Sequence, residues 1–328
     1  MKRDGKEYDL VAVGESLIDF VSVASSQEGC LRFDGHTGGG PANVLAMAGK
    51  LGLRTAVISK VGTDVFGRQI REVMEKHGVD TKYLLISTEY PTTLAFVSLD
   101  AQGERSFSFY RKNTADVMLS EQELDKNLLQ STRCLHFASV SLTVEPSRSA
   151  TLKAAWTAKE AGALISFDMN LRPRLWEDVA SAKKVVSEAL HLCNAVKLSE
   201  EELYFLTDLT DIEEAMRELQ RRYPEMQLLA VTLGSEGAKV LSGGAVTYSP
   251  GFKVETRDTT GAGDTFWGAF LFRLLGGEVS LREMRGDRLT GTLAFANAAA
   301  ALSTMSYGAI SSMPTYAEIE SFLAQRAP

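Results

Sequence analysis

The stretch Asp258-Thr259-Thr260-Gly261-Ala262-Gly263-Asp264 joins a tight glycine turn to a segment with helical periodicity, because apolar residues recur at helical spacing between Phe266 and Leu271. The first backbone N–H groups of a helix have no partner within it, and the helix dipole adds positive potential there. The stretch therefore predicts a pocket for a phosphate or another anion, with the carboxylate of Asp264 at its mouth. The same residues would also make a plain turn in which Asp264 only caps the helix.

A second glycine cluster, Gly38-Gly39-Gly40-Pro41-Ala42-Asn43, lies far upstream and also precedes a helical pattern. Pro41 suits the first turn of a helix. Gly39 and Gly40 allow a ligand to come close to the backbone, and Asn43 offers a donor and an acceptor to a hydroxyl group. An ordinary glycine turn before a helix is the alternative interpretation.

The composition excludes several classes of protein. The chain has 328 residues, 45% of them hydrophobic, and a net charge of −7. A surface of this sign argues against nucleic acid, which selects basic surfaces. The three cysteines are widely spaced, which favours a reduced, cytoplasmic setting and argues against zinc. No apolar run is long enough to span a membrane, and no apolar signal core follows the charged N-terminus.

Strand and helix patterns alternate along most of the chain, which predicts an α/β fold of three layers with helices on both faces of a mainly parallel sheet. A hairpin pattern at residues 92–110, with its turn at 100–104, interrupts the alternation. We place this hairpin with a strand pair in residues 20–36, in a small β sheet that acts as a lid. The expected division is a core of residues 1–14, 37–90 and 114–328 and a lid of residues 15–36 and 91–113.

Together the two glycine clusters resemble the paired signatures of the ribokinase-like carbohydrate kinases, the PfkB family, and the resemblance covers nearly the whole chain. It implies a ribokinase-like αβα fold and transfer of a phosphoryl group from ATP to a sugar hydroxyl. Asp264 would be the general base, and the amides of Gly261, Ala262 and Gly263 would form the anion hole. Phosphoryl transfer needs alignment and charge neutralisation more than a strong base, so an ordinary Asp can serve.

The resemblance also assigns binding residues. On the sugar side these are Asp19, Gly39, Gly40, Asn43, Phe96, Phe109, Arg111 and Arg172, of which the two phenylalanines would belong to the lid. On the nucleotide side they are Lys197, Ser199, Thr232, Gly234, Gly237 and Asn297.

Two metal sites are implied as well. The family often carries Asn-x-x-Glu to position Mg²⁺ through water and phosphate. Here Ser199 stands in the place of the Asn and Glu202 keeps the Glu, and the same four residues also form a helix capping box. Many members bind a monovalent cation such as K⁺ beside the anion hole, which would involve the backbone near Asp258, Thr260, Ser303, Gly308 and Ser312.

Within the family, the sequence looks most like the fructokinases, which make fructose 6-phosphate from D-fructose. The features are Gly14-Glu15 with Leu17-Ile18-Asp19, Phe109-Tyr110-Arg111 followed by Ala115-Asp116, and Asn170-Leu171-Arg172-Pro173. A homodimer through the lid sheet is also expected, because exposed strand edges favour such pairing.

Several alternatives remain open. The first is a 2-keto-3-deoxygluconate kinase, whose substrate carboxylate would use the same arginines, and the second is a nucleoside kinase. A sugar-sensing protein without turnover belongs to another class. A dinucleotide oxidoreductase is disfavoured, because Gly14-Glu15-Ser16-Leu17 does not supply the glycine fingerprint that should follow the first strand. The Gly-x-x-x-x-Gly-Lys motif of other phosphate-binding proteins is also absent.

Overall fold

The computed structural model describes residues 5–23, 29–99, 105–276 and 281–326. Within them the main sheet has ten strands in the order β14-β13-β12-β11-β10-β9-β1-β4-β5, with β6 paired to the far part of β4. All neighbours are parallel except β12-β13-β14. The strands are β1 Leu10–Val13, β4 Thr55–Gly62, β5 Val79–Asp80, β6 Leu84–Ser87, β9 Cys134–Ala138, β10 Leu164–Asp168, β11 Ala195–Ser199, β12 Leu228–Thr232, β13 Gly237–Ser242 and β14 Ala245–Pro250.

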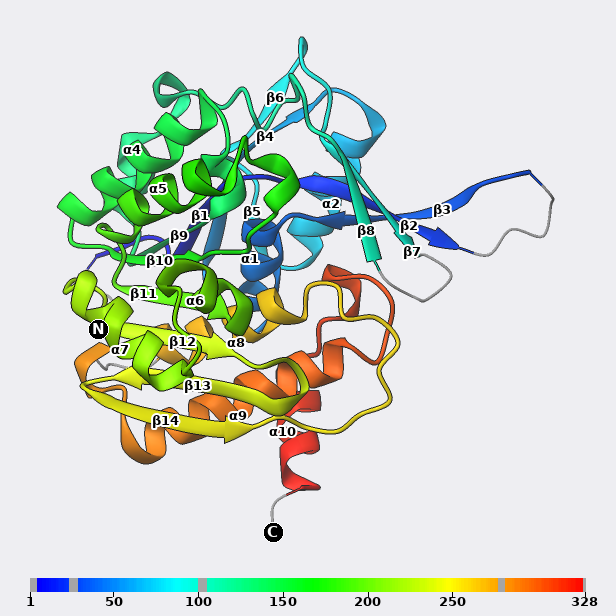
Figure 1. Ribbon diagram of the computed structural model, residues 1–328. Coiled ribbons are helices and arrows are strands. Elements are labelled where there is room, and N and C mark those ends of the chain that lie inside the picture. Colours follow the sequence, from blue (N-terminus) through cyan, green and yellow to red (C-terminus); the bar gives the residue numbers. More distant parts are fainter. Residues whose placement is uncertain (1–4, 24–28, 100–104, 277–280, 327–328) are drawn as a thin grey trace.

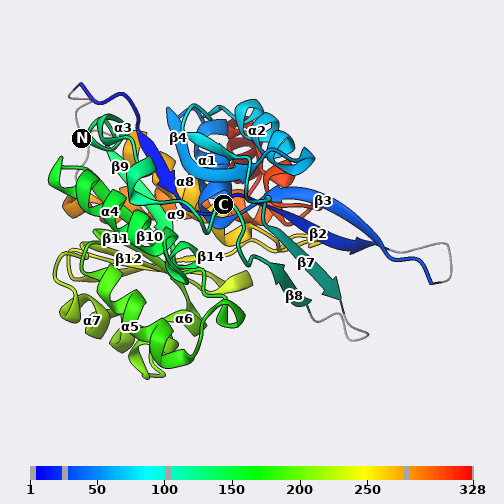
Figure 2. The ribbon, with the colours of Figure 1, turned by 90° about the horizontal axis from the view of Figure 1, so that it is seen from above.

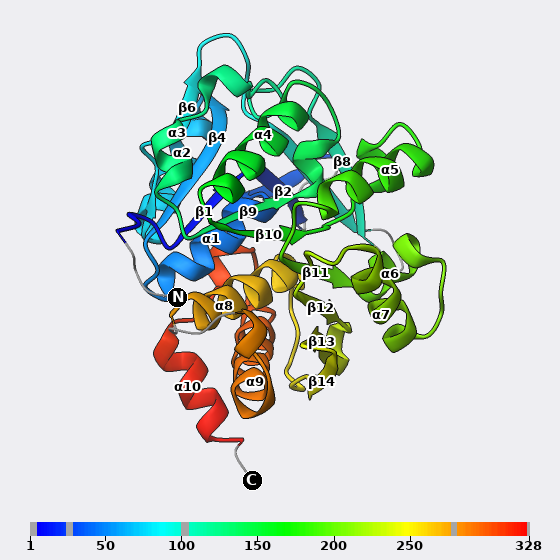
Figure 3. The same cartoon turned by 90° about the vertical axis from the view of Figure 1, so that its left-hand side faces the viewer.

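Helices cover both faces of this sheet, so the fold has the expected three layers (Figures 1 and 3). Strand β1 shows why: Leu10 and Ala12 belong to one hydrophobic cluster, and Val11 and Val13 to the other. The first cluster is built with α1 Gly40–Lys50, α2 Val65–Lys76, α8 Ala262–Gly276, α9 Gly286–Ser303 and α10 Tyr316–Ala324. The second is built with α3 Lys126–Gln130, α4 Ser147–Glu160, α5 Val179–Leu190, α6 Glu200–Thr207 and α7 Ile212–Arg222.

A separate four-stranded sheet projects from one side of the main body (Figures 1 and 2). Its strand order is β3-β2-β7-β8, formed by β2 Leu17–Val23, β3 Arg32–Gly38, β7 Leu94–Leu99 and β8 Arg105–Tyr110. These strands fall in the two segments that the sequence assigned to the lid, except that β3 continues two residues further, to Gly38. The hairpin turn at 100–104 lies outside the described residues.

Aromatic side chains hold the small sheet together. The ring of Phe96 stacks on Phe20 at 5.0 Å between centroids and meets Phe33 edge-on at 5.2 Å. Phe20 in turn meets Phe66 of α2 edge-on at 5.6 Å. Such pairs add about 0.5–1.5 kcal/mol each beyond the area that they bury. The cluster therefore joins three strands of the small sheet to the core.

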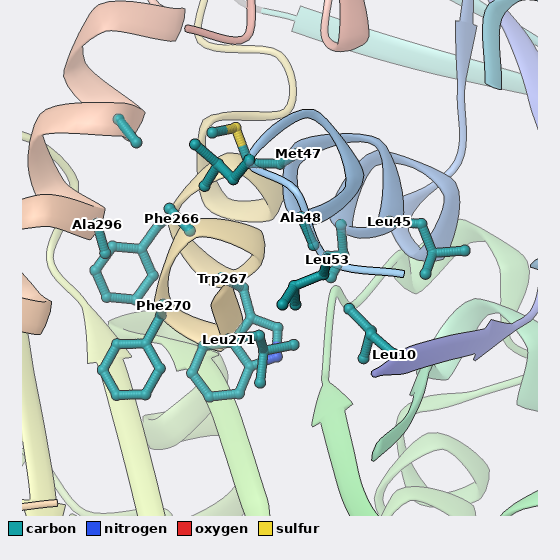
Figure 4. Close-up of a cluster of buried hydrophobic side chains, with 14 of the residues drawn as sticks. Leu10, Leu45, Met47, Ala48, Leu53, Phe266, Trp267, Phe270, Leu271 and Ala296 are labelled. Carbon is teal, nitrogen blue, oxygen red and sulfur yellow. The ribbon is translucent and has the colours of Figure 1, made fainter. Parts of the chain in front are cut away.

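Helix α8 is buried on nearly all sides, and it packs closely against α1 (Figure 4). A Cβ atom on Gly268 would lie 2.7 Å from Cβ of Met47 and 2.8 Å from the carbonyl oxygen of Val44, so only glycine allows this approach. On the other side, Nε1 of the fully buried Trp267 donates a hydrogen bond to Oγ of Ser166 at 2.9 Å. These contacts fix the position of the helix start and of the stretch 258–264 before it.

Two element ends are set by the local backbone. The sequence pattern predicts a strand at 135–140, but β9 ends at Ala138, because Ser139–Leu142 turn into a 3-10 helix. The helix that follows Ser199 stops at Thr207, where Asp208 adopts left-handed backbone with φ of 57°. None of the described helices is both long and apolar enough to cross a membrane.

Candidate active site

The turn before α8 is held from both ends. Gly261 has φ of 73°, and a Cβ atom on it would lie 2.6 Å from Cβ of Ala309, so glycine is required there. The carboxylate of Asp258 accepts hydrogen bonds from the amide of Thr260 at 2.9 Å and from the amide of Gly308 at 2.9 Å. The turn is thereby tied to the loop around residue 308, and it is preorganised without a ligand.

Asp264 is the third residue of α8, beyond the position of an N-cap. It is 9% exposed, and its Oδ2 accepts a hydrogen bond from Nδ2 of Asn43 at 2.8 Å. Burial raises the pKa of Asp264, and the charges of Lys197 and Arg172 together with the Asn43 bond only partly offset it. The two glycine clusters of the sequence therefore meet at this carboxylate.

A cavity of about 210 Å³ opens beside Asp264. Its walls combine the small sheet, the two glycine stretches and the carboxyl end of β10. The lining residues are Glu15, Leu17, Asp19, Gly39, Gly40, Asn43, Phe109, Val140, Asn170, Arg172, Thr259, Thr260, Gly261 and Asp264. Six of the eight residues expected on the sugar side are in this list.

Asp19 projects from β2 into this cavity. A Cβ atom on Gly38, its neighbour on β3, would collide with the Asp19 carboxylate, so the second glycine cluster makes room for the acid. Burial raises the pKa of Asp19 to about 7; the charge of Arg172 opposes the shift, and that of Asp264 adds to it. Burying a carboxyl group whose pKa is raised this far lowers the stability of the folded protein. Such groups are typical of functional sites.

The glycines of the cluster 38–43 are shaped by close backbone contacts. Gly39 has φ of 111°, and a Cβ atom on it would lie 2.5 Å from the carbonyl oxygen of Glu15. The amide of Gly40 donates to Oε1 of Glu15 at 3.0 Å, and a Cβ atom there would lie 2.5 Å from Nδ2 of Asn170. Glu15 and Asn170 line the cavity; both belong to the fructokinase-like features of the sequence, but neither was assigned to substrate binding. Each follows the carboxyl end of a parallel strand by two residues, and that position was the available signal.

Two residues expected on the sugar side do not reach the cavity wall. Phe96 lies in the aromatic cluster of the small sheet. The guanidinium of Arg111 is buried where β8 leaves the small sheet. There Nε donates to Oδ2 of Asp116 at 2.7 Å and Nη1 donates to Oγ1 of Thr143 at 2.8 Å. Arg111 therefore stands behind the wall, at the base of the hairpin β7-β8.

A second cavity, of about 240 Å³, lies on the other side of the turn. Apolar side chains of Phe252, Val254 and Phe266 form much of its wall, and Ala262 and Gly263 form its inner end. Four of the six residues expected on the nucleotide side line it, namely Thr232, Gly234, Gly237 and Asn297. Thr259 borders both cavities, so they meet at the stretch 258–264.

The other two residues expected on the nucleotide side lie beneath this junction. Nζ of Lys197 lies 3.0 Å from both carboxylate oxygens of Asp168. A Cβ atom on Gly263 would lie 2.9 Å from the same Nζ. Burial lowers the pKa of Lys197, but the surrounding carboxylates, Asp168 first, outweigh it and the pKa is raised. The buried ammonium therefore stays charged directly under the turn.

Ser199 and Glu202 form the expected capping box. The amide of Glu202 donates to Oγ of Ser199 at 3.2 Å, and the amide of Ser199 donates to Oε2 of Glu202 at 2.8 Å. Oε1 of Glu202 accepts from the amide of Leu171 at 2.7 Å. Both oxygens of Glu202 are thus anchored by backbone amides, and a carboxylate oxygen with one such bond can accept another from a water molecule.

The residues expected around a monovalent cation are partly brought together. Asp258, Thr260 and Gly308 share hydrogen bonds, whereas the hydroxyls of Ser303 and Ser312 bond to carbonyl oxygens three residues earlier. Among the described residues, no group of three or more His, Cys, Asp or Glu side chains is arranged to hold a metal ion.

Comparisons with known proteins agree with this geometry. Fructokinase-1 of Zea mays is 41% identical over 313 residues, covering 94% of this chain and 96% of its own length. Probable fructokinase-4 of Arabidopsis thaliana is 40% identical over 98% of both chains. Among solved structures, fructokinase with bound ATP from Xylella fastidiosa has a TM-score of 0.90 at 29% identity, over 100% of both chains. Fructokinase from Vibrio cholerae, in a form with fructose, ADP and calcium ion bound, has a TM-score of 0.85 at 32% identity over 96% of this chain and 99% of that chain.

The family model described as pfkB family carbohydrate kinase matches residues 8–316. This range includes both cavities and the turn between them. The chain belongs to the pfkB family of carbohydrate kinases.

Proposed function

We propose that this protein is an ATP-dependent fructokinase, which transfers the γ-phosphoryl group of ATP to D-fructose and makes fructose 6-phosphate. The observation that carries the proposal is the position of Asp264. Its carboxylate lies where a cavity with polar walls and a cavity with largely apolar walls meet at the start of α8. Relatives about 40% identical to this chain are named fructokinases, and the fructokinase structure from Vibrio cholerae holds fructose and ADP.

In the proposed mechanism, a sugar hydroxyl lies against Asp264, which takes its proton as the bond to phosphorus forms. The amides of Gly261, Ala262 and Gly263 hold the transferred group, and positioned donors of this kind contribute roughly 3–4 kcal/mol each. The charge of Lys197 under Gly263 adds to their positive potential. On the sugar side, Asp19, Gly39, Gly40, Asn43 and Arg172 orient the hydroxyls.

For the nucleotide, we propose that the base occupies the apolar cavity lined by Phe252, Val254 and Phe266. The base or its ribose would contact Thr232, Gly234, Gly237 and Asn297. Lys197 and Ser199 would act from beneath the junction of the two cavities. Glu202 is a carboxylate near Lys197 whose two oxygens accept hydrogen bonds from backbone amides, whereas both oxygens of Asp168 are bonded to the Lys197 ammonium. We propose Mg²⁺, which neutralises phosphate charge when bound, with Glu202 holding it through water. We also propose a K⁺ site at the carbonyl groups near Asp258, Thr260, Ser303, Gly308 and Ser312.

The substrate is tested by a panel of acceptors with ATP and Mg²⁺. Among D-fructose, ribose, adenosine and 2-keto-3-deoxygluconate, we expect D-fructose to give the highest kcat/KM. An advantage of tenfold or more for the keto acid, about 1.4 kcal/mol in transition-state binding, would refute the fructose assignment and leave the family unchanged. Sugar binding without any ADP release would instead favour a sensing protein.

We propose that residues 15–36 and 91–113 form a lid over the core of residues 1–14, 37–90 and 114–328. Phe109 of the small sheet already lines the sugar cavity. Closure would exclude water, which otherwise competes for the phosphoryl group. Amide hydrogen exchange in β7 and β8 is expected to slow when D-fructose is added. Exchange that stays the same at saturating sugar would count against the lid.

Two further features complete the proposal. The exposed edges of the small sheet suit pairing with a second copy of the chain, so we propose a homodimer through the lid, which a solution mass measurement checks. We propose the cytoplasm as its location, because its phosphoryl donor is ATP.

A further inference from the structure

The Arg111 guanidinium lies between the sugar cavity and the base of the hairpin β7-β8, with its side chain only 4% exposed. Two of its nitrogens are taken by Asp116 and Thr143, at 2.7 Å and 2.8 Å. The third, Nη2, is buried and has no hydrogen-bond partner among the described residues. On the cavity side, the carboxylate of Glu15 feels the charge of Arg111.

Asp116 is held by two threonine hydroxyls as well as by Arg111. Its Oδ1 accepts hydrogen bonds from the hydroxyls of Thr93 and Thr114, and its Oδ2 accepts from Nε of Arg111. Thr93 comes just before β7, so the acid sits where both strands of the hairpin join the core. Its side chain is 1% exposed, which makes the pair with Arg111 a fully buried ion pair. Such a pair is expensive to open for another partner.

The two carboxylate oxygens of Glu15 differ in their surroundings. Its Oε1 accepts from the amide of Gly40, while Oε2 is buried and lacks a partner among the described residues. Burial raises the pKa of Glu15 to about 7, Arg111 opposes the shift, and Asp116 adds to it. An unpaired buried acceptor costs free energy until a donor arrives, and a sugar hydroxyl is such a donor.

The charges around the cavity therefore do not suit an anion. Its walls hold three carboxylates, Glu15, Asp19 and Asp264, against the single guanidinium of Arg172. Behind the wall, the charge of Arg111 is already matched by Asp116. With pKa values raised to about 7, Glu15 and Asp19 are partly ionised at neutral pH. A substrate carboxylate would be repelled by their ionised forms, whereas the hydroxyls of an uncharged ketose can donate to them. Specificity of this kind comes from rejecting the wrong ligand as much as from holding the right one.

We propose that Asp116, together with Glu15, neutralises the positive charge of Arg111, so that this charge does not attract a substrate carboxylate. The sugar cavity thereby selects an uncharged ketose over a sugar acid. This inference rests on the proposed sugar-kinase function, and it assigns Asp116 as a specificity-determining residue that acts through Arg111.

The test is Asp116→Asn, which keeps the size of the side chain and an acceptor for the threonine hydroxyls but removes the negative charge. We measure kcat/KM for D-fructose and for 2-keto-3-deoxygluconate with ATP and Mg²⁺. The ratio of the two values is expected to fall at least tenfold, equivalent to about 1.4 kcal/mol, with the keto acid gaining in absolute efficiency. Asp211→Asn is the matched control, because it makes the same charge change at a residue that caps α7. The ratio of the two kcat/KM values in this variant should match that of the wild type.

Equal losses for both substrates in Asp116→Asn would show that the acid only anchors the hairpin, and would overturn the inference. If this variant does not fold, Glu15→Gln decides, since Gln still offers an oxygen to the amide of Gly40. The same direction of change in the ratio supports the inference, and an unchanged ratio refutes it. A wild-type protein that phosphorylates neither substrate refutes the proposed function itself, so the two failures are distinguishable.

Discussion

Replacing Asp264 by Asn is expected to lower turnover by roughly 10² to 10⁴, the usual range for the loss of a general base. The substitution keeps the size of the side chain and leaves an oxygen that can accept the hydrogen bond from Asn43, now seen at 2.8 Å. It removes the ability to take a proton from the sugar. The affinity for sugar and the melting temperature should therefore change little.

The measurement is kcat at saturating ATP and D-fructose, with thermal unfolding recorded in parallel. Removing a raised-pKa acid from a buried site relieves a cost of folding, so the variant should be at least as stable as the wild type at neutral pH. A folded variant whose turnover stays within about threefold of the wild type would show that Asp264 is not the base.

The second large effect is expected for Gly261→Ala. The residue has φ of 73°, and the added Cβ atom would lie 2.6 Å from Cβ of Ala309. The left-handed backbone costs an alanine about 1–2 kcal/mol, and relief of the clash must move the turn. Displaced amides no longer face the transferred phosphoryl group, so kcat should fall by about 10² to 10³.

The matched control is Gly291→Ala in α9, where an added Cβ atom meets nothing within 4 Å. Alanine is the better helix former there by about 1 kcal/mol, so this variant should be fully active and somewhat more stable. A Gly261→Ala enzyme with wild-type turnover would mean that the amides of the turn do not form the anion hole. Loss of fold in Gly261→Ala alone would be seen in thermal unfolding and separated from loss of turnover.

Local patterns predicted much of the fold. The alternation of strands and helices indicated the three layers, and the hairpin around residues 92–110 was recognisable because it breaks that alternation. The predicted strand 105–110 matches β8 residue for residue. The prediction was less accurate at Ala138, where the chain leaves the sheet for a 3-10 turn.

The site was predictable in part for a similar reason. Gly261 and Gly39 mark positive backbone angles, and such positions leave a trace in the sequence. The carboxylate of Asp264 and the amide of Asn43 lie 221 residues apart in sequence, and only the family resemblance suggested that they meet. Nothing local shows that the Arg111 guanidinium bonds to Asp116 and Thr143, because these contacts depend on how the base of the hairpin packs.

The most direct test of the central claim is to identify the product formed from ATP, Mg²⁺ and D-fructose. We expect one ADP for each sugar consumed, and phosphorus and carbon NMR should show the phosphate on the 6-hydroxyl of fructose. ADP release that does not depend on the sugar, with inorganic phosphate as the only product, would contradict the account.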